Sequence, residues 1–491
     1  MKLEQVIDNT KVFVANMPKT VRKEYGQFFT GKETAIYMAS LFEIPNDRSI
    51  KILDAGAGSG ILATALVERL ETIDFIQEIE ITCYETDSKV IPLLQQNLNL
   101  LTTNTTKKIS YILKNENYIT SQGNDFNSDI NGIKYDLIIG NPPYKKIPKD
   151  CDEAKALPSV CYGAPNLYFL FATLGLYNLK DNAELVYIIP RSWTSGAYFT
   201  RFREYFLSKG VITHLHLFQS RDKVFGGEQV LQETMIIKIR KSSKPPKTVT
   251  ITSTPDSKDF SNQNKITVDY KSVVSGKDKY VFLITNKDDE MTLKRVNKNT
   301  HILPELNMRM KTGLTVDFRN RDILKNNFEL GVIPLFYSQH IKNGIVQFPI
   351  NKENEFIIAN IKGLLQENKN YLFVKRFTAK EEKQRLQCGI YLSKNVPGFE
   401  KISTQNKLNF IDGVGENLTE ERVYGLYVLF NSTLYDNYYR ILNGSTQVNS
   451  TEVNTIPIPD CKTIDSMGTD LLKTQDLSQK NCDVILEKYN V

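Results

Sequence analysis

Four consecutive residues could activate an aromatic amine for methyl transfer: Asn141, Pro142, Pro143 and Tyr144. The lone pair of such an amine is delocalised into its ring, so the nitrogen is a poor nucleophile until both of its protons are held in hydrogen bonds. The Asn141 side-chain oxygen and the Pro142 main-chain carbonyl could accept these two bonds, and the prolines fix the direction of that carbonyl. Tyr144 could stack on the base and stabilise the positive charge that grows on its nitrogen. The simpler interpretation is a proline-rich turn after a strand.

A second group of residues could bind a nucleoside. The segment after the first apolar run is rich in glycine and consists of Asp54, Ala55, Gly56, Ala57, Gly58, Ser59 and Gly60. Glycines let the backbone turn tightly and approach a ligand, with the start of a helix behind it. Glu85 lies at the end of the next apolar run, where a carboxylate could accept hydrogen bonds from both hydroxyls of a ribose.

The spacing and charge of the glycine-rich segment favour S-adenosylmethionine over a dinucleotide. Nicotinamide-dinucleotide sites space their glycines as GxGxxG, whereas here they follow the pattern GxGxG. The Asp54 carboxylate would repel a pyrophosphate, but it suits the ammonium and sulfonium charges of S-adenosylmethionine. A glycine turn that binds no ligand is the remaining alternative.

The elements that must position these residues alternate through the first half of the chain. The apolar runs that predict strands are residues 49–54, 79–84, 135–140, 183–190 and 235–240. The patterns that predict helices are residues 61–70, 90–98 and 166–179. Strands that alternate with helices predict an α/β fold, with a mainly parallel sheet and helices on both faces.

A polar, basic and proline-rich stretch, residues 241–247, follows the last of these strands and is typical of a linker. After it the alternation disappears, and from about Thr300 the apolar runs are short and irregular. We therefore expect a catalytic domain over residues 1–245, a connecting segment over 246–299 and a second domain of mixed α and β structure over 300–491.

The composition is that of an ordinary globular protein. The 491 residues include 41% hydrophobic ones, and the net charge of +6 permits a nucleic-acid partner without requiring one. The six cysteines form no CxxC pair, and no acid or cysteine cluster accompanies His214 and His216, so we expect neither disulfides nor a metal site. We expect a cytoplasmic protein without a membrane span, because no signal-peptide pattern and no run of about 20 apolar residues occurs.

Together these motifs resemble the gamma class of N6-adenine DNA methyltransferases of restriction–modification systems, the group typified by the TaqI methylase. The resemblance covers residues 20–245 motif by motif and continues more loosely to about residue 460. Residues 25–30, YGQFFT, are similar to the N-terminal cofactor motif of that family, although its usual proline is Gly31 here. Residues 54–60 are similar to its methionine-binding loop, Glu85 to its ribose acid and residues 141–144 to its catalytic tetrapeptide.

The resemblance implies roles for two further positions. The acid that binds the cofactor's adenine, usually in an Asp-Phe pair, corresponds to Asn117-Tyr118, where the Asn117 amide oxygen would accept from the adenine amine. Phe225 corresponds to the aromatic residue that packs against the target base. The implied cofactor contacts are Thr30, Asp54, Ala55, Gly56, Gly58, Gly60, Glu85, Asn117 and Asn141. The implied catalytic residues are Asn141, Pro142, Tyr144 and Phe225.

The resemblance also implies a fold and a reaction. The first domain would be a Rossmann-like methyltransferase domain with a mainly parallel seven-stranded sheet. The second would be a target-recognition domain that reads a short sequence in double-stranded DNA, and three stretches look like its recognition region: residues 311–321, 374–378 and 443–449. The target adenine would flip out of the duplex to meet S-adenosyl-L-methionine, with Tyr144 and Phe225 on its two faces.

By this interpretation the chain is the modification enzyme of a type II restriction–modification system. We expect a monomer that uses no metal. The cofactor motif starts near Tyr25, so any restriction endonuclease for the same target would be a separate chain. Enzymes with the same tetrapeptide also methylate base amines in RNA or glutamine in proteins, but those would need a different substrate domain. A DNA-binding protein with a vestigial cofactor fold would require damage to the tetrapeptide, which is intact.

Overall fold

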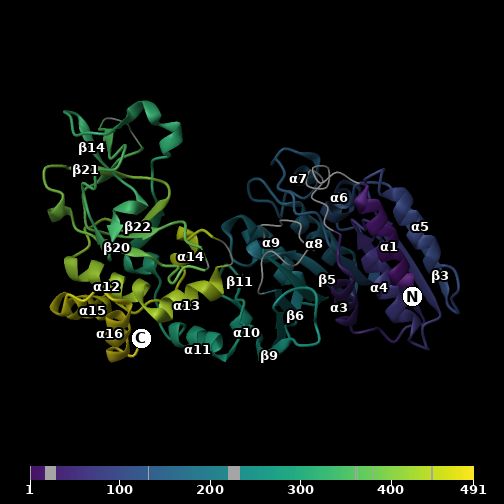
Figure 1. The fold of residues 1–491 in the computed structure, drawn as a ribbon. Helices are drawn as coiled ribbons and strands as arrows, with labels where there is room; N and C mark the ends of the chain where they lie inside the picture. Colours follow the sequence, from purple (N-terminus) through teal and green to yellow (C-terminus); the bar gives the residue numbers. More distant parts are fainter. Residues whose placement is uncertain are drawn as a thin grey trace. The chain divides into compact units, whose positions relative to one another are not determined.

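The computed structural model describes residues 2–16, 29–130, 132–218, 233–359, 361, 363–379, 381–443 and 446–491. The chain divides into two compact units, Met1–Thr285 and Asn286–Val491 (Figure 1). The first unit therefore extends beyond residue 245, where the proline-rich stretch predicted the end of a domain. Each unit has its own sheets and its own buried core, and we describe them separately.

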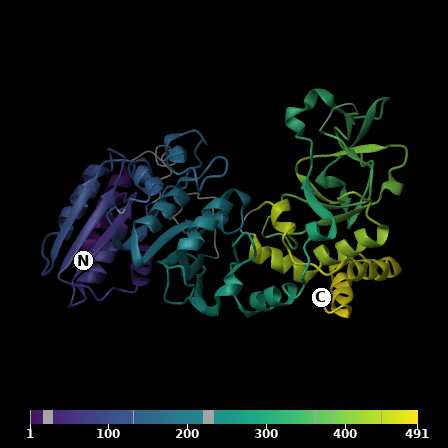
Figure 2. The same cartoon turned by 180° about the vertical axis from the view of Figure 1, so that it is seen from behind.

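The first unit is built on one large sheet, which Figure 2 shows from behind. Among the described residues, nine strands form it, in the order β3 (Lys108–Lys114), β2 (Glu78–Tyr84), β1 (Ser49–Ala55), β4 (Tyr135–Gly140), β5 (Leu179–Pro190), β7 (Thr234–Lys241), β6 (Gly210–Phe218), β8 (Thr248–Thr254) and β9 (Asn264–Asp269). The strands from β3 to β5 are parallel, whereas β7 is antiparallel to both β5 and β6. The predicted α/β class is confirmed.

The sheet is larger than the seven strands that the resemblance implied. Its two additional strands come from the predicted connecting segment, since β8 pairs with β6 and β9 pairs with β8. Residues 242–247 are thus a short turn within the sheet and not a linker between domains. Polar and apolar residues alternate along β8, TVTITST, as in a strand near a sheet edge. The flanking lysines and prolines indicate a linker more strongly than this short alternation indicates a strand.

Helices cover both faces of this sheet, as predicted. The buried cluster on one face includes residues of α1 (Lys2–Ala15), α3 (Lys32–Ser40), α4 (Ile61–Glu71) and α5 (Ile91–Leu101). The other helices of the unit are α6 (Tyr118–Ser128), α7 (Asp152–Ala156), α8 (Leu167–Asn178), α9 (Thr200–Lys209) and the short α10 (Tyr270–Val273), followed by the hairpin β10 (Val274–Ser275) and β11 (Tyr280–Val281). α8 is apolar on all sides and buried along its length, because it packs against β5, α6 and α9.

The second unit has the predicted mixed α and β structure. Its described strands form a six-stranded sheet in the order β12 (Met308–Thr312), β22 (Leu408–Gly413), β19 (Tyr371–Lys375), β20 (Cys388–Tyr391), β16 (Ile345–Val346) and β15 (Ile341–Lys342). A five-stranded sheet follows the order β13 (Leu324–Lys325), β17 (Phe356–Ile358), β14 (Val332–Phe336), β21 (Lys401–Thr404) and β18 (Gln366–Glu367). Short strands and long connections explain why the sequence shows no simple period here.

Helices complete the second unit: α11 (Lys287–Val296), α12 (Glu420–Asn431), α13 (Thr433–Leu442), α14 (Ser450–Val453), α15 (Cys461–Thr474) and α16 (Gln479–Lys488). α12 and α15 approach so closely that a Cβ atom at Gly425 would lie 1.9 Å from the Ile464 carbonyl oxygen. A Cβ atom at Gly468 would lie 1.8 Å from the Glu421 carbonyl oxygen, so glycine is required on both helices. Within the described residues, no helix is both long enough and apolar enough to cross a membrane.

The His214-x-His216 pair lies on β6 in a polar network inside the first unit. His216 is fully buried, and its ring nitrogens lie 2.9 Å from the Thr252 hydroxyl and 3.1 Å from the Thr254 hydroxyl. The Tyr37 hydroxyl lies 3.2 Å from the His214 ring and 2.8 Å from the Thr252 hydroxyl. Among the residues with described side chains, no group of three or more histidines, cysteines and acids that could hold a metal ion includes this pair.

The two histidines should make the first unit sensitive to acid. Burial lowers the pKa of His214 from 6.5 to about 4 and that of His216 from 6.5 to about 3. Between pH 6.5 and these values the unfolded chain binds protons that the folded chain does not, so stability falls with falling pH. The expected slope is about 1.4 kcal/mol per pH unit for each histidine. Denaturant titrations at pH 6.5 and 5 should show a smaller loss for His216→Gln than for the unaltered protein. Ring NMR signals of His214 that titrate near pH 6.5 would contradict the assignment.

Candidate active site

The predicted site residues that the structure describes lie near the ends of the parallel strands β3, β2, β1 and β4. In the sheet, β2 lies on one side of β1 and β4 lies on the other. In α/β sheets, this change of direction in the strand order opens a crevice at the carboxyl ends of the strands. A cavity of about 240 Å³ lies there. Its lining is Phe29, Gly56, Gly58, Tyr84, Glu85, Thr86, Glu116, Asn117, Tyr118, Ile119, Asn141, Pro143, Lys145, Glu153, Leu167 and Phe171.

The glycine-rich loop is tied to the end of β2 by its own backbone. The amides of Gly56 and Ala57 both donate to the Tyr84 carbonyl, at 2.9 and 3.0 Å. Gly56 and Gly58 have φ values of +72° and +56°, which only glycine adopts without strain. The loop therefore lines the cavity with bare backbone and leaves the space above it for a ligand.

Glu85 is held in place by three backbone amides. Its Oε1 accepts from the amides of Thr86 and Asp87 at 2.8 and 2.9 Å, and its Oε2 accepts from Gly58 at 2.9 Å. Burial raises the pKa of this carboxyl, while the three amide hydrogen bonds act in the opposite direction. A carboxylate offers about four acceptor positions, so Glu85, which lines the cavity, could accept a further hydrogen bond from a ligand.

Asp54 is a buried acid that forms no ion pair with any residue that the structure describes. Its side chain is 1% exposed; Oδ2 accepts from the Ala63 amide at 3.3 Å, and Oδ1 has no hydrogen-bond partner among the described residues. Burial, with a smaller contribution from Glu85, raises the pKa of Asp54 to about 7. An unpaired carboxylate behind a glycine loop fits a cationic ligand such as S-adenosylmethionine, because the ligand's charge would offset the cost of keeping the acid ionised.

The tetrapeptide after β4 forms a small hydrogen-bonded unit. The Tyr144 hydroxyl lies 2.8 Å from Asn141 Oδ1 and 2.9 Å from the Ile188 carbonyl oxygen, so its single proton is shared between two acceptors. Asn141 Nδ2 donates to the Thr30 hydroxyl at 3.2 Å. The Tyr144 ring is half-buried against the core and meets Tyr168 edge-on, with ring centroids 6.4 Å apart. Both ends of the Asn141 amide are thus oriented.

The cavity contains some of the predicted residues and not others. Gly56, Gly58, Glu85, Asn117 and Asn141 line it. Thr30, Ala55, Pro142 and Tyr144 lie next to lining residues in sequence or by hydrogen bond, but outside the lining itself. Asp54 and Gly60 also lie outside the lining, each two positions from a lining glycine of the same loop. Phe225 and residues 25–28 of the predicted cofactor motif lie outside the described residues.

The structure gives Asn117 another task than the one the resemblance implied. Its amide oxygen caps α6, accepting from the amides of Ile119 and Thr120 at 3.0 and 3.3 Å. Its Nδ2 donates to Glu153 Oε1 at 2.9 Å. Because asparagine is a favoured N-cap residue, the sequence could have indicated that Asn117 caps the start of a helix.

Sequence reasoning missed several residues of the cavity wall. Phe171 and Leu167 belong to the predicted helix at 166–179, but a helix that is apolar on all sides does not show which side faces a ligand. Glu153 stands on the five-residue helix α7, in a segment that carries no motif. A charged residue in such a segment is more often a solvated one, so no pattern distinguished it.

Comparisons with known proteins cover both units. A family model described as Eco57I restriction-modification methylase matches residues 66–225. Type II methyltransferase M.BsuBI of Bacillus subtilis is 34% identical to this chain over 99% of the chain and 97% of that protein. Type II methyltransferase M.PstI of Providencia stuartii is 32% identical over 91% of the chain and 89% of that protein.

A solved structure has a similar fold over the same extent. The type IIL restriction–modification enzyme MmeI, in complex with DNA, aligns with 99% of this chain and 72% of its own chain. The TM-score is 0.54 and the identity 12%, so the likeness concerns the fold alone.

The buried acid should favour ligand binding at the expense of stability. The pKa of Asp54 rises from 3.8 to about 7 on folding, so its ionisation weakens the ligand-free fold increasingly as the pH rises through that window. Asp54→Asn should raise the free energy of unfolding at pH 8 by at most about 4 kcal/mol, and by less at pH 5. The same variant should lose most of its affinity for S-adenosylmethionine in calorimetry. Equal changes in stability at both pH values, or unaltered affinity, would contradict this role.

Proposed function

The chain belongs to the type II methyltransferases of restriction–modification systems, and on that premise we propose that it transfers the methyl group of S-adenosylmethionine to the N6 amine of an adenine in a DNA recognition sequence. The observation that carries the proposal is the Asn141 amide, which is oriented at both ends beside a glycine-lined cavity. Bound S-adenosylmethionine supplies an electrophilic methyl group on a sulfonium.

Asn141 and Pro142 would activate the adenine amine. The Asn141 oxygen already receives the Tyr144 hydroxyl, and a carbonyl oxygen has a second lone pair that can accept an amine proton. The Pro142 carbonyl would accept the other amine proton, and the two bonds together free the nitrogen lone pair. The freed lone pair could then take the methyl group that bound S-adenosylmethionine would supply, and the proton that the amine loses would pass to water.

The Tyr144 hydroxyl serves a positioning role in this proposal. It holds the Asn141 oxygen at 2.8 Å and is itself anchored by the Ile188 carbonyl on β5. A fixed hydroxyl keeps the amide from rotating, so the acceptor is aimed before the base arrives. Tyr144 and Phe225 would flank the flipped base, and this stacking role stays a prediction.

We propose the second unit for target recognition, because two of the predicted stretches contact one turn and the third contacts one of these two. The turn joins β21 to β22 at residues 405–407. Its Asn406 amide donates to the Thr315 carbonyl at 2.8 Å, and its Lys407 carbonyl accepts from the Arg376 amide at 3.1 Å. A Cβ atom at Gly313 would lie 2.1 Å from the Gln405 carbonyl oxygen, so glycine permits this close approach.

The third stretch joins the same surface through the second. The Val448 amide donates to the Arg376 carbonyl at 2.7 Å, and the Thr378 amide donates to the Thr446 carbonyl at 3.1 Å. Phe377 is 46% exposed, and Lys407 is also exposed. Basic, amide and aromatic groups on a shared loop surface are the types that contact DNA phosphates and bases.

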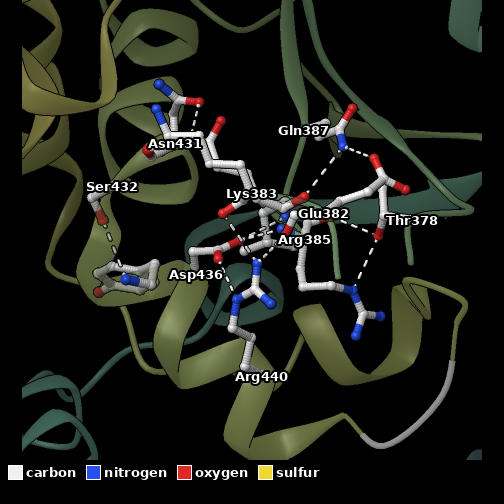
Figure 3. A network of polar contacts seen from close by, with 12 residues as sticks. Thr378, Glu382, Lys383, Arg385, Gln387, Asn431, Ser432, Asp436 and Arg440 are labelled. Carbon is white, nitrogen blue, oxygen red and sulfur yellow. Dashed lines mark hydrogen bonds and ion pairs between the residues drawn. The ribbon is translucent and has the colours of Figure 1, made fainter. Parts of the chain in front are cut away.

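A polar network connects the loop that follows Thr378 to the helix α13 (Figure 3). The Asp436 carboxylate on α13 accepts from the amides of Arg385 and Leu386 at 2.6 and 2.9 Å, and from Arg440 Nε at 2.7 Å. The Arg385 side chain is fully buried and donates to the Thr378 hydroxyl at 3.2 Å. The loop after Thr378 is therefore anchored to α13, which supports a defined arrangement of the recognition stretches.

The remaining partners follow from the same proposal. We propose that the enzyme acts as a cytoplasmic monomer on double-stranded DNA, without a metal. A restriction endonuclease with the same target would be encoded as a separate chain. In this proposal, residues 1–285 would catalyse methyl transfer and residues 286–491 would recognise the target sequence.

Loss of the Asn141 amide should abolish methylation and leave cofactor binding largely intact. Asn141→Ala removes an acceptor that strengthens in the transition state, and the expected loss of kcat is at least about 100-fold. Tyr144→Phe keeps the ring and should lose less activity than Tyr144→Ala. The assay is tritium transfer from labelled S-adenosylmethionine to DNA, RNA and protein from one host. Near-normal turnover by Asn141→Ala, or label in RNA or protein instead of DNA, would overturn the proposal.

The turn at residues 405–407 should contribute to DNA affinity through charge. Lys407→Ala should weaken binding to every DNA sequence alike, and it should reduce the slope of log K against log salt by about 0.9. Lys401→Ala is the matched control, because Lys401 is an exposed lysine at the far end of β21. Fluorescence anisotropy over a salt series measures both. Equal slopes for the two variants would remove the turn from the DNA surface.

A further inference from the structure

Three carboxylates line the cavity, those of Glu85, Glu116 and Glu153, and the function proposed above uses only that of Glu85. Glu116 is exposed and pairs with Lys114 at 3.5 Å. Glu85 follows β2, whereas Glu153 belongs to α7, far along the chain. Glu153 is half-buried and forms no ion pair with a lysine or arginine of the described residues. A carboxylate that is partly removed from water without a cation needs hydrogen-bond donors.

Asn117 provides one donor and thereby fixes the Glu153 carboxylate. Its Nδ2 lies 2.9 Å from Glu153 Oε1, while its own oxygen is engaged by two amides of α6. The only group that Asn117 can present on this side is an amide N–H, which donates. An adenine amine also donates, so Asn117 is unsuited to accept it, whereas the Glu153 carboxylate that Asn117 holds lines the same cavity and can accept.

The walls beside Glu153 suit a flat aromatic ring. Tyr118 and Ile119 lie on α6, and Phe171 lies on α8, with the rings of Tyr118 and Phe171 5.5 Å apart and tilted by 43°. Glu85 lines the same cavity and would hold the ribose. A nucleoside with its sugar at Glu85 would have its base among these apolar groups, where the half-buried Glu153 carboxylate would favour a purine that carries an amine.

We propose that Glu153 accepts a hydrogen bond from the exocyclic amine of the cofactor's adenine, and that Asn117 is a positioning residue that holds the carboxylate. This inference rests on the proposed cofactor site and adds the residue that distinguishes adenine from a 6-oxopurine. A 6-oxopurine carries a carbonyl in place of the amine, and its oxygen would face the carboxylate oxygen without a proton between them.

Calorimetric binding of two ligands tests the inference without measuring turnover. S-adenosylhomocysteine carries the adenine amine, and S-inosylhomocysteine carries the carbonyl. The unaltered protein should prefer the first by about tenfold or more, as expected for a hydrogen bond to a charged group. Glu153→Gln presents an N–H to the carbonyl, and it should reduce this preference by at least about tenfold. Asp152→Asn is the matched control, since it removes a charge from an exposed neighbour on the same helix, and it should leave the preference unaltered.

Exchanging the amide at position 117 with the carboxylate at position 153 distinguishes a role in recognising adenine from a purely structural role. The double variant N117D/E153Q retains one carboxylate and one amide, and aspartate also caps helices well. It should regain most of the preference that Glu153→Gln loses. Failure of both ligands to bind the unaltered protein would overturn the proposed cofactor site itself. Binding of S-adenosylhomocysteine with no preference over the inosine compound, or a preference that Glu153→Gln leaves intact, would overturn only the assignment of Glu153.

Discussion

The site depends on four parallel strands that end side by side at one edge of the sheet. Each strand end supplies one group, and a backbone hydrogen bond or a short turn fixes it: the glycine loop after β1, Glu85 after β2, Asn117 after β3 and Asn141 after β4. Because the strands are rigid and buried, the spacing of these groups follows from the strand spacing of about 4.8 Å. Variation in loops far from this edge would leave the spacing intact.

Burial gives the groups at that edge their chemical character. Desolvation raises the pKa of Asp54 to about 7 and also raises that of Glu85. Three backbone amides satisfy Glu85, whereas Asp54 Oδ1 has no hydrogen-bond partner among the described residues. Tyr144 lies in the same dry environment, and burial raises the pKa of its hydroxyl, which therefore stays protonated and acts as a donor to Asn141. One arrangement thus prepares a site for a cation and keeps a neutral acceptor oriented for an amine.

In the second unit, backbone and side-chain hydrogen bonds hold the loops in one arrangement. The three stretches proposed for target recognition have their backbone groups hydrogen-bonded to one another and to the turn at residues 405–407. Buried charges below them are satisfied by several hydrogen bonds each, as the Asp436 carboxylate illustrates. A polar network of this kind holds loops in one arrangement while their outward side chains remain free to vary.

The sequence by itself determined the α/β class and the positions of the strands β1, β2, β4, β5 and β7. It also determined that a glycine loop follows β1, that Glu85 follows β2 and that the tetrapeptide follows β4. Each of these is encoded within a few neighbouring residues, through period, glycine content or a motif. Only the tertiary structure decided that β8 and β9 extend the first sheet, that Asn117 is turned to Glu153, and that Gly313 lies against the turn at Gln405. Those facts join residues that are far apart in the chain, and no local pattern records a contact whose partner is set by the path of the backbone.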